Sequence, residues 1–388
     1  MKHFSYFAPT EIVFGWGCLK EIGVLAARYG RRALVVTGHS SAIGTATRTR
    51  ALEYLAEAGV EALHFDGVVP NPTTEVVSAG AEMAKRFNAE LIIGLGGGSS
   101  MDTAKAIAVE AVHPGTAWDY LHYTPGPTEK TLPIIAVGTT AGTGSQTTPC
   151  AVITNAAQRD KSAIWHKHIF PKIALVDPEL TVSMPKEISA RTGFDAFCHN
   201  FEAYLSVNAN PLTDALALDA LGIITGALPA VLADGNNREA RSRMAWADTA
   251  GGLAIASAGV TLPHGLGMQI SGICPQVSHG QSLAVFYPEF TRYTWRSAPE
   301  KFAALGRLLD PALQKADDRT AAEKSCEAID GFIQKLGLRI DFKSLGVSKE
   351  DIRAIADRGQ VLGDYKNNPR IATIPEMYDM LMRCYDIG

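Results

Sequence analysis

The chain has 388 residues, enough for about two or three domains of ordinary size. Hydrophobic residues make up 46% of the chain and charged residues 20%, a composition that excludes a wholly disordered protein. The formal net charge of −4 and the lack of basic runs argue against a protein that binds nucleic acid through charge. No uninterrupted apolar stretch approaches about 18 residues, so we expect no membrane span.

The N-terminal residues and the cysteines bear on the cellular compartment. Residues 1–15 have no apolar core followed by a small-residue cleavage site, so we expect no signal peptide. The six cysteines are scattered without a CxxC pair, a pattern typical of reduced thiols. Both features favour a cytoplasmic protein.

The first half of the chain alternates short β-branched runs with helical stretches. Strands are expected at residues 33–37, 62–65, 91–95, 133–137 and 173–176. Amphipathic helices are expected near residues 44–58 and 73–87. Alternation of this kind predicts a parallel sheet with crossover helices.

From about Pro185 the pattern changes to long helices rich in Ala and Leu. Helices are expected at residues 187–206, 211–233, 238–259, 298–309 and 318–336. The segment from Asp177 to Pro185 is expected to be the hinge, since its prolines discourage helix continuation. The sequence therefore predicts an α/β domain over residues 1–182, followed by an all-α domain over residues 183–388.

A glycine-rich turn follows the expected strand at 91–95. Gly96, Gly97 and Gly98 allow the backbone to approach a ligand closely and to adopt positive φ angles. Ser99 or Ser100 can cap the helix that follows, whose free amides form an anion site. A tight strand-to-helix turn would explain the glycines alone, but the serines at the helix start favour phosphate binding. The spacing is not GxGxxG, so this is not the usual dinucleotide fingerprint.

A second loop of small residues, 138–145, follows the expected strand at 133–137. Its hydroxyl groups are suited to bind the ribose or the phosphates of a cofactor. Taken alone, the loop is explained as well by an ordinary turn.

A carboxylate and three histidines form a candidate metal site. Asp195 and His199 are four residues apart, so on a helix they share one face and can chelate a divalent ion. Glu202 is placed to orient such a ligand shell. A core histidine or a capping pair would explain Asp195 and His199 equally well. Two further histidines, His264 and His279, each precede a glycine, and the four side chains together make a mixed N/O site that suits Fe(II) or Zn(II) rather than Ca or Mg.

Together these features resemble the iron-containing (group III) alcohol dehydrogenase family, and the resemblance extends over nearly the whole chain. Several motifs in the right order are more specific than any one of them. They comprise residues 71–73, 96–105, 139–145, Lys161, 177–180, 195–202, the two His-Gly pairs and 368–370.

The resemblance implies a fold like that of dehydroquinate synthase. It implies an N-terminal nucleotide-binding α/β domain with a parallel sheet and an all-α C-terminal domain that binds metal and substrate. The implied metal ligands are Asp195, His199, His264 and His279. The implied coenzyme contacts are Gly38, Asn71, Gly97, Gly98, Ser99, Asp102, Thr139, Thr140, Thr143 and Lys161.

The implied reaction is hydride transfer between NAD(P) and a primary or small secondary alcohol or aldehyde, with the metal acting as a Lewis acid on the substrate oxygen. Family members are commonly dimers or larger assemblies, so we expect a homo-oligomer that binds a small-molecule substrate and neither nucleic acid nor membrane. Fe(II) is the expected ion, and Zn(II) would use the same ligands.

Three positions depart from the pattern of the family. Gly138 and Gln146 stand at the start and just after the end of the loop 138–145, here called the threonine loop, where the family usually has Pro and Glu. Met268 stands where many members carry a histidine thought to relay the proton. No proton-relay group is therefore identified in this chain.

Gly38 bears on the choice of coenzyme. NAD-preferring relatives often have an aspartate here, which bonds the ribose 2′-OH and repels a 2′-phosphate. Gly38 does neither, while His39, Ser40 and Ser41 supply donors to a phosphate. The sequence therefore favours NADP(H), or dual use with NAD(H); a tight turn is the alternative explanation for Gly38.

Three other functions compete with an iron-type dehydrogenase. A zinc-dependent polyol dehydrogenase of the glycerol type would use the same site. A dehydroquinate synthase-like lyase would keep the fold, but the iron-family motifs disfavour it. The four candidate ligands disfavour a non-catalytic nucleotide-binding protein.

Overall fold

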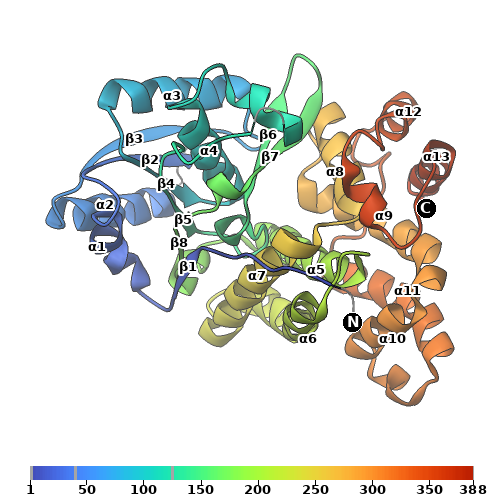
Figure 1. The fold of residues 1–388 in the computed structure, drawn as a ribbon. Helices are drawn as coiled ribbons and strands as arrows, with labels where there is room; N and C mark the ends of the chain where they lie inside the picture. The colour runs from blue at the N-terminus through green and yellow to red at the C-terminus, as the bar shows by residue number, and fades with distance from the viewer. Residues whose placement is uncertain (1–2, 39–41, 124–125, 388) are drawn as a thin grey trace. The chain divides into compact units, whose positions relative to one another are not determined.

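The computed structural model describes residues 3–38, 42–123 and 126–387. The chain divides into two compact units, one formed by Phe7–Met184 and the other by Met1–Tyr6 with Pro185–Gly388. The first is an α/β unit and the second is helical, as the sequence predicts (Figure 1). Tyr6 belongs to the helical unit and not to the α/β part, and its hydroxyl donates to the carbonyl of Leu253 at 3.3 Å.

The α/β unit is built on a six-stranded parallel sheet with the strand order β1-β8-β5-β4-β2-β3. The strands are β1 (Glu11–Phe14), β2 (Arg32–Gly38), β3 (Glu61–Val68), β4 (Leu91–Gly96), β5 (Ile134–Gly138) and β8 (Ile173–Val176). The five expected strands are confirmed. The edge strand β1 was not expected, because it is short and exposed at both ends.

Helices cover both faces of this sheet, with α1 (Ile22–Ala26) and α2 (Ala42–Glu57) on one face and α3 (Thr74–Phe87) and α4 (Gly98–Glu110) on the other (Figure 1). Successive strand residues point to opposite faces. Accordingly Val35 of β2 packs in one core with Leu55 of α2, while Leu34 packs in the other core with Ile107 of α4. The chain thus changes faces between β2 and β4, and such a switch point is where open α/β sheets bind ligands.

The carboxyl ends of β2, β4 and β5 lie side by side at one edge of the sheet. Val36 of β2 is in register with Gly94 of β4, and Gly96 of β4 is in register with Gly138 of β5. The loops that follow these strands therefore begin at the same edge, which places the glycine-rich turn beside the threonine loop.

A separate antiparallel pair, β6 (Cys150–Asn155) and β7 (Asp160–Trp165), was not expected from the sequence. Short 3₁₀ turns connect the larger elements of both units. They are η1 (Cys18–Glu21), η2 (Ala117–Tyr123), η3 (Ser145–Thr147), η4 (Lys167–Ile169), η5 (Pro178–Thr181), η6 (Trp295–Ser297), η7 (Pro311–Lys315) and η8 (Gly363–Asn367).

The segment expected to be a hinge begins as a fixed turn of the α/β unit. The carboxylate of Asp177 accepts hydrogen bonds from the backbone N–H groups of Gly17 and Leu19, both at 3.0 Å. The same carboxylate caps η5 by accepting from the N–H of Glu179. The boundary between the units falls later, between Met184 and Pro185.

The helical unit contains α5 (Lys186–Leu205), α6 (Pro211–Ala233), α7 (Arg238–Ala258), α8 (Leu262–Ile273), α9 (His279–Thr294), α10 (Pro299–Leu309), α11 (Asp318–Lys335), α12 (Lys349–Asp357) and α13 (Ile374–Arg383). The expected helices correspond to α5, α6, α7, α10 and α11 and are confirmed. Helix α5 packs against α6, α7 and α9, so most of its residues are buried. The elements that hold the candidate metal ligands therefore lie inside the helical core.

Helix α6 bears on the expectation that the chain has no membrane span. Among the described residues, α6 is long and apolar enough to cross a membrane, judged by length and composition alone. Its buried residues recur at helical spacing, for example Thr213, Ala217, Ala220 and Ile224, and the helix packs against α5 and α7. Helices that pack one face against the rest of a globular protein show this pattern.

Candidate functional site

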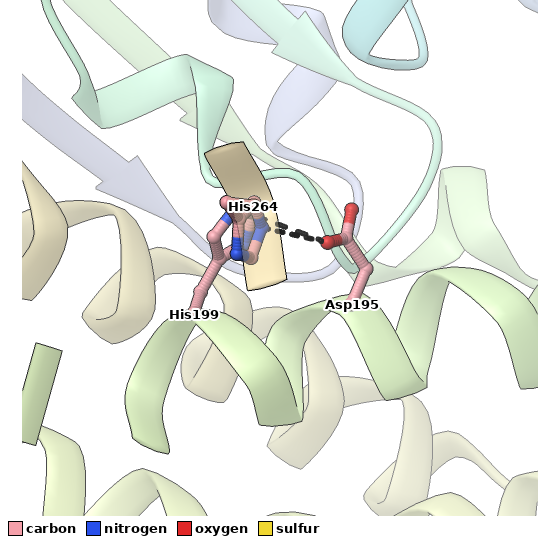
Figure 2. Close-up of side chains that lie close together, drawn as sticks. All are labelled: Asp195, His199 and His264. Atoms are coloured by element: carbon pink, nitrogen blue, oxygen red, sulfur yellow. Dashed lines mark ion pairs between the residues drawn. The ribbon is translucent and has the colours of Figure 1, made fainter. Parts of the chain in front are cut away.

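The candidate metal site is built mainly on α5. Asp195 and His199 lie one turn apart on the same face of this helix, and His264 from α8 faces them (Figure 2). The rings of His199 and His264 stack with their centroids 4.5 Å apart. The expectation that a four-residue spacing brings Asp195 and His199 together is confirmed.

One carboxylate oxygen is the centre of this cluster. The Oδ1 atom of Asp195 is surrounded by the Nε2 atoms of His264 at 3.4 Å, His279 at 3.7 Å and His199 at 3.9 Å. Ligands about 2.1 Å from a tetrahedral ion lie about 3.4 Å from one another. Ligand atoms of Asp195, His199 and His264 are also all within 4.8 Å of each other. The spacing therefore fits side chains that share one ion.

Two of these atoms are buried without a hydrogen-bond partner among the residues that the structure describes. They are Asp195 Oδ1 and His264 Nε2. A buried polar atom that lacks a partner is costly, and ligation of a cation removes that cost. The donor set thus fits a divalent ion on grounds of both chemistry and burial.

The electrostatics of the cluster point the same way. Burial by itself raises the pKa of the Asp195 carboxyl, but the imidazoles of His199, His279 and His264 hold it well below its usual value. Burial lowers the pKa of His264, yet the carboxylates of Glu202 and Asp195 outweigh this effect and raise it to about 10. The two carboxylates thus make the cluster attractive to a cation, which binds by displacing protons.

Glu202, one turn after His199 on α5, is fully buried and orients His264. Its Oε1 atom lies 2.8 Å from Nδ1 of His264. Its Oε2 atom accepts hydrogen bonds from the backbone N–H of Thr261 at 2.8 Å and from the Thr261 hydroxyl at 3.2 Å. This arrangement leaves Nε2 of His264 directed toward Asp195, as expected from the position of Glu202 in the sequence.

Asp364, in η8, is a neighbour of the site that the sequence analysis missed. Burial raises the pKa of its carboxyl to about 6. A Cβ atom on Gly265 would lie 3.4 Å from Cβ of Asp364, so the carboxyl-bearing turn packs directly against the start of α8. Only the Asn-Pro-Arg motif four residues later marked this region in the sequence. Met268, one turn after His264, is buried and brings no titratable group.

The glycine-rich turn differs from expectation in two details. Helix α4 begins at Gly98 with Gly97 as its N-cap, so neither Ser99 nor Ser100 caps it; both lie inside the first turn. Of the three glycines, only Gly96 has a positive φ, at 154°. Because no side chain caps α4, its first N–H groups remain available to an anion.

The threonine loop packs directly onto this turn. The N–H of Thr139 donates to the carbonyl of Gly96 at 2.8 Å. A Cβ atom on Gly97 would lie 3.3 Å from Cγ2 of Thr140, and one on Gly98 would lie 2.8 Å from Cγ2 of Thr143. Within the described residues, Oγ1 of Thr140 is buried and has no hydrogen-bond partner. The loop is therefore suited to donate to a ligand bound at the turn.

Three of the remaining expected coenzyme residues form hydrogen bonds within the protein. Lys161 on β7 donates from Nζ to Oδ1 of Asn71 at 2.8 Å, and Asn71 has a φ of 53°. The carboxylate of Asp102 is held within the protein, where it accepts from the Ser145 hydroxyl at 2.6 Å and from the N–H of Val152 at 3.2 Å.

Gly38 and Ser99 occupy the same edge of the sheet. Gly38 is the last residue of β2, and a Cβ atom there would lie 3.4 Å from the carbonyl oxygen of Val68. Ser99 lies in the first turn of α4, where its carbonyl accepts from the Thr103 hydroxyl at 2.7 Å. The other expected phosphate donors, His39, Ser40 and Ser41, lie outside the described residues.

Family comparison agrees with this geometry in both units. A model for "Iron-containing alcohol dehydrogenase" matches residues 9–178, and one for "Fe-containing alcohol dehydrogenase family, C-terminal" matches residues 189–385. The NAD-dependent methanol dehydrogenase of Bacillus methanolicus is 33% identical over 381 residues, which cover 97% of this chain and 98% of that protein. The 1,3-propanediol dehydrogenase of Klebsiella pneumoniae is 34% identical over 371 residues, with 95% of each chain covered.

Structural comparison gives the same result. An archaeal halo-thermophilic alcohol dehydrogenase from a Red Sea brine pool, solved bound to NZQ, is 34% identical and has a TM-score of 0.94. The match covers 99% of this chain and 100% of the other. The chain therefore belongs to the iron-containing alcohol dehydrogenase family, and it is a metal-dependent oxidoreductase that transfers hydride between a nicotinamide coenzyme and an alcohol or aldehyde.

Proposed function

We propose that Asp195, His199, His264 and His279 hold one divalent ion, Fe(II) by preference, in a helical metal and substrate domain over residues 183–388. The observation that carries this proposal is the position of Asp195 Oδ1, buried without a hydrogen-bond partner among the described residues and within 3.9 Å of three imidazole Nε2 atoms. One carboxylate and three imidazoles also suit Zn(II), so the same ligands would accept zinc.

The α/β part, over residues 1–182, is proposed as the coenzyme domain. Support comes from the switch point between β2 and β4 and, within the described residues, from the N-terminus of α4 that no side chain caps and the buried hydroxyl of Thr140 that has no hydrogen-bond partner. Asp102 is proposed to belong to the same coenzyme site, where it holds the loop that ends at Ser145. The proposed coenzyme contacts are Gly38, Asn71, Gly97, Gly98, Ser99, Thr139, Thr140, Thr143 and Lys161.

The residues of the chain have separate tasks in this scheme. When bound, the ion supplies a Lewis acid for the substrate oxygen. Glu202 fixes the ring of His264, and the first turn of α4 offers its N–H groups to the coenzyme phosphates. Met268, on α8, stands where many members of the family carry a histidine thought to relay the proton, so no side chain is assigned to proton transfer.

The proposed substrate is a primary or small secondary alcohol, or the corresponding aldehyde. The relatives reported above are named for methanol and 1,3-propanediol, which are both primary alcohols. A zinc-dependent polyol dehydrogenase is the second candidate, because the ligand set does not distinguish Zn(II) from Fe(II).

One panel experiment tests these proposals together. Apoenzyme is reconstituted with Fe(II), Zn(II), Mn(II) or Co(II), and kcat/KM is measured for primary, secondary and polyhydric alcohols and for aldehydes with both coenzymes. We expect the highest kcat/KM with Fe(II) and a primary alcohol or its aldehyde. Highest activity with Zn(II) and glycerol-type polyols would favour the second candidate, and equal activity without added metal would overturn the proposed site.

We also propose that the protein is a cytoplasmic homo-oligomer. The cysteines are free in the structure, which is typical of a reducing compartment and supports the location. The assembly is supported by the resemblance, because members of the family are commonly dimers or larger assemblies. Light scattering coupled to size exclusion tests the assembly, and a mass of 41.4 kDa, that of one chain, would overturn it.

A further inference from the structure

Lys105 is a fully buried lysine that the proposed function does not use. It lies on α4, two turns after the glycine-rich turn, and its side chain has no exposed surface. Lysine is almost never fully buried unless its charge is compensated, because removing an ammonium group from water is costly. The hydrogen-bond partners of Lys105 therefore show which segment of the chain its ammonium group holds in place.

Every donor of this ammonium group is directed at one segment of chain. Nζ of Lys105 donates to the carbonyl of Ser145 at 2.7 Å, to the Ser145 hydroxyl at 2.8 Å and to the carbonyl of Cys150 at 2.6 Å. An ammonium group has three donors, so these contacts use all of them. Ser145 ends the threonine loop, and residues 146–150 follow it directly.

Asp102 completes the cluster from the same helix. Its Oδ1 atom lies 3.7 Å from Nζ of Lys105 and accepts a hydrogen bond from the Ser145 hydroxyl, with 2.6 Å between the two oxygen atoms. Its Oδ2 atom accepts from the N–H of Val152 at 3.2 Å. Asp102, Lys105 and Ser145, here called the Lys105 cluster, thus tie helix α4 to the chain that leaves the threonine loop.

The two ends of the threonine loop are therefore fixed by different means. At its start, Thr139 is hydrogen-bonded to Gly96 and the loop continues directly from β5. At its end, the Lys105 cluster holds Ser145. Between these points Thr143 packs so closely on the turn that a Cβ atom on Gly98 would lie 2.8 Å from it. The spacing between the loop and the first turn of α4 thus depends on the cluster.

We propose that Lys105 is a positioning residue for coenzyme binding, which sets the distance between the threonine loop and the N-terminus of α4. This inference rests on the proposed function of the glycine-rich turn and loop as the coenzyme site. Lys105 also faces Asp102 at 3.7 Å, so the two groups compensate each other inside the cluster. Lys105 itself acts on the loop and has no contact with the coenzyme.

The principal test replaces Lys105 by Met, which keeps the length of the side chain and removes its charge and donors. For Lys105→Met we expect the Kd of NADH and of NADPH, from fluorescence titration, to rise by about 10- to 100-fold, as for other misplaced binding groups. The alcohol KM at saturating coenzyme and the metal content should stay unchanged, because the candidate ligands lie in the other unit. Lys85→Met, at an exposed position of α3, is the matched control and should bind coenzyme normally.

Two further variants keep the test decisive if Lys105→Met does not fold. Ser145→Ala removes one acceptor of Lys105 and leaves both carbonyls, and should raise the coenzyme Kd by about threefold. The double variant Asp102→Asn/Lys105→Met no longer buries the carboxylate that Lys105→Met leaves without its cation. The hydrogen bonds from Lys105 to Ser145 and Cys150 are still missing, so we expect coenzyme binding to remain as weak as in Lys105→Met. Recovery of normal coenzyme affinity in the double variant would overturn the positioning role.

The outcomes separate this inference from the proposed function. If folded Lys105→Met binds both coenzymes with unchanged Kd, or if its coenzyme and alcohol constants rise equally, Lys105 only stabilises the fold and the inference is wrong. If Gly98→Val also leaves coenzyme binding unchanged, the turn is not the coenzyme site and the proposed function fails as well. If Gly98→Val loses coenzyme affinity and folded Lys105→Met does not, the inference about Lys105 is wrong and the proposed coenzyme site stands.

Discussion

The Nδ1 atom of His264 lies 2.8 Å from the Oε1 atom of Glu202, and the opposite ring nitrogen points at Asp195. Both carboxylate oxygens of Glu202 accept hydrogen bonds, since Oε2 receives the N–H and hydroxyl of Thr261. A glutamine at this position would direct its NH₂ group at one of these donors, whichever way its amide is turned. The carboxylate is therefore needed to hold the ring through Nδ1 and to leave Nε2 facing Asp195.

We predict that Glu202→Gln weakens metal binding by about 10- to 100-fold, as for other partners of metal-bound histidines. Metal affinity is measured by competition with a chromophoric chelator, and coenzyme Kd is measured in parallel and should not change. Glu327→Gln, at an exposed position of α11, is the matched control. Unchanged metal affinity in Glu202→Gln would show that Glu202 is only a structural partner of Thr261.

The second prediction concerns the ligands themselves. His264→Ala removes a buried imidazole that faces Asp195, so the purified variant should retain less than about a tenth of the wild-type metal while still folding. Metal is counted by atomic emission and folding is followed by circular dichroism. His279→Ala should also lose metal, whereas His168→Ala, in η4 of the other unit, should keep it. A His264→Ala variant with full metal content and rate would place the site elsewhere.

Helix starts show how far the fold could be predicted from sequence. Asn210 caps α6 through its side chain and Pro211 follows at the first helical position, so both signals of the start are local and visible. Helix α8 has Pro263 in its first turn, but no side-chain cap holds its start and Gly265 and Gly267 are poor helix formers. Every residue of α8 is nevertheless buried, and tertiary packing decides its conformation.

The same limit applies to the candidate site: local spacing predicts part of it, and packing between elements decides the rest. The pairing of Asp195 with His199 follows from helical spacing, which is local information. The approach of His264 to Asp195 joins residues from separate helices and depends on how the helical unit packs, so the sequence could only group His264 with Asp195 by its His-Gly context and by the resemblance. Asp364 reaches the site from η8 and belongs to no recognised motif. Lys105 lies in the motif 96–105, but its burial and its contacts with Ser145 were not predicted, because a lysine on a helix is usually solvated.

A third prediction follows from the closeness of Gly98 to Thr143. Even a single carbon on Gly98 would stand 2.8 Å from Cγ2 of Thr143, so a branched side chain must displace the threonine loop. Gly98→Val should therefore raise the coenzyme KM by at least about tenfold, or about 1.4 kcal/mol, while the alcohol KM changes little. Steady-state kinetics with each substrate varied in turn measures both constants.

A matched control for that substitution lies on α6. Gly226 has no atom within 4 Å of its Cβ position, so Gly226→Ala should leave both KM values unchanged. Combining Gly98→Ala with Thr143→Ser removes the nearest methyl group and should recover part of the coenzyme affinity lost in Gly98→Ala alone. Equal rises in both KM values for Gly98→Val would indicate general damage to the protein instead of a blocked coenzyme site.

The final prediction concerns coenzyme preference. Gly38 ends β2 at the switch point of the sheet, where a carboxylate would bond a ribose 2′-OH and repel a 2′-phosphate. A Cβ atom at Gly38 would lie 3.4 Å from the carbonyl oxygen of Val68, so a small side chain fits with slight adjustment. The absence of a carboxylate at this position is therefore not imposed by crowding, and Gly38→Asp is a usable probe.

We expect kcat/KM for NADPH to equal or exceed that for NADH in the wild type, and Gly38→Asp to shift the ratio toward NADH by at least about tenfold, which is about 1.4 kcal/mol in the transition state. Gly38→Ala is the control for the added carbon, and it should leave the ratio unchanged because it brings no charge. If wild-type enzyme prefers NADH by tenfold or more, Gly38 does not mark NADP(H) use. If Gly38→Ala shifts the ratio as far as Gly38→Asp does, the effect arises from the turn at the end of β2, and charge at this position does not select the coenzyme.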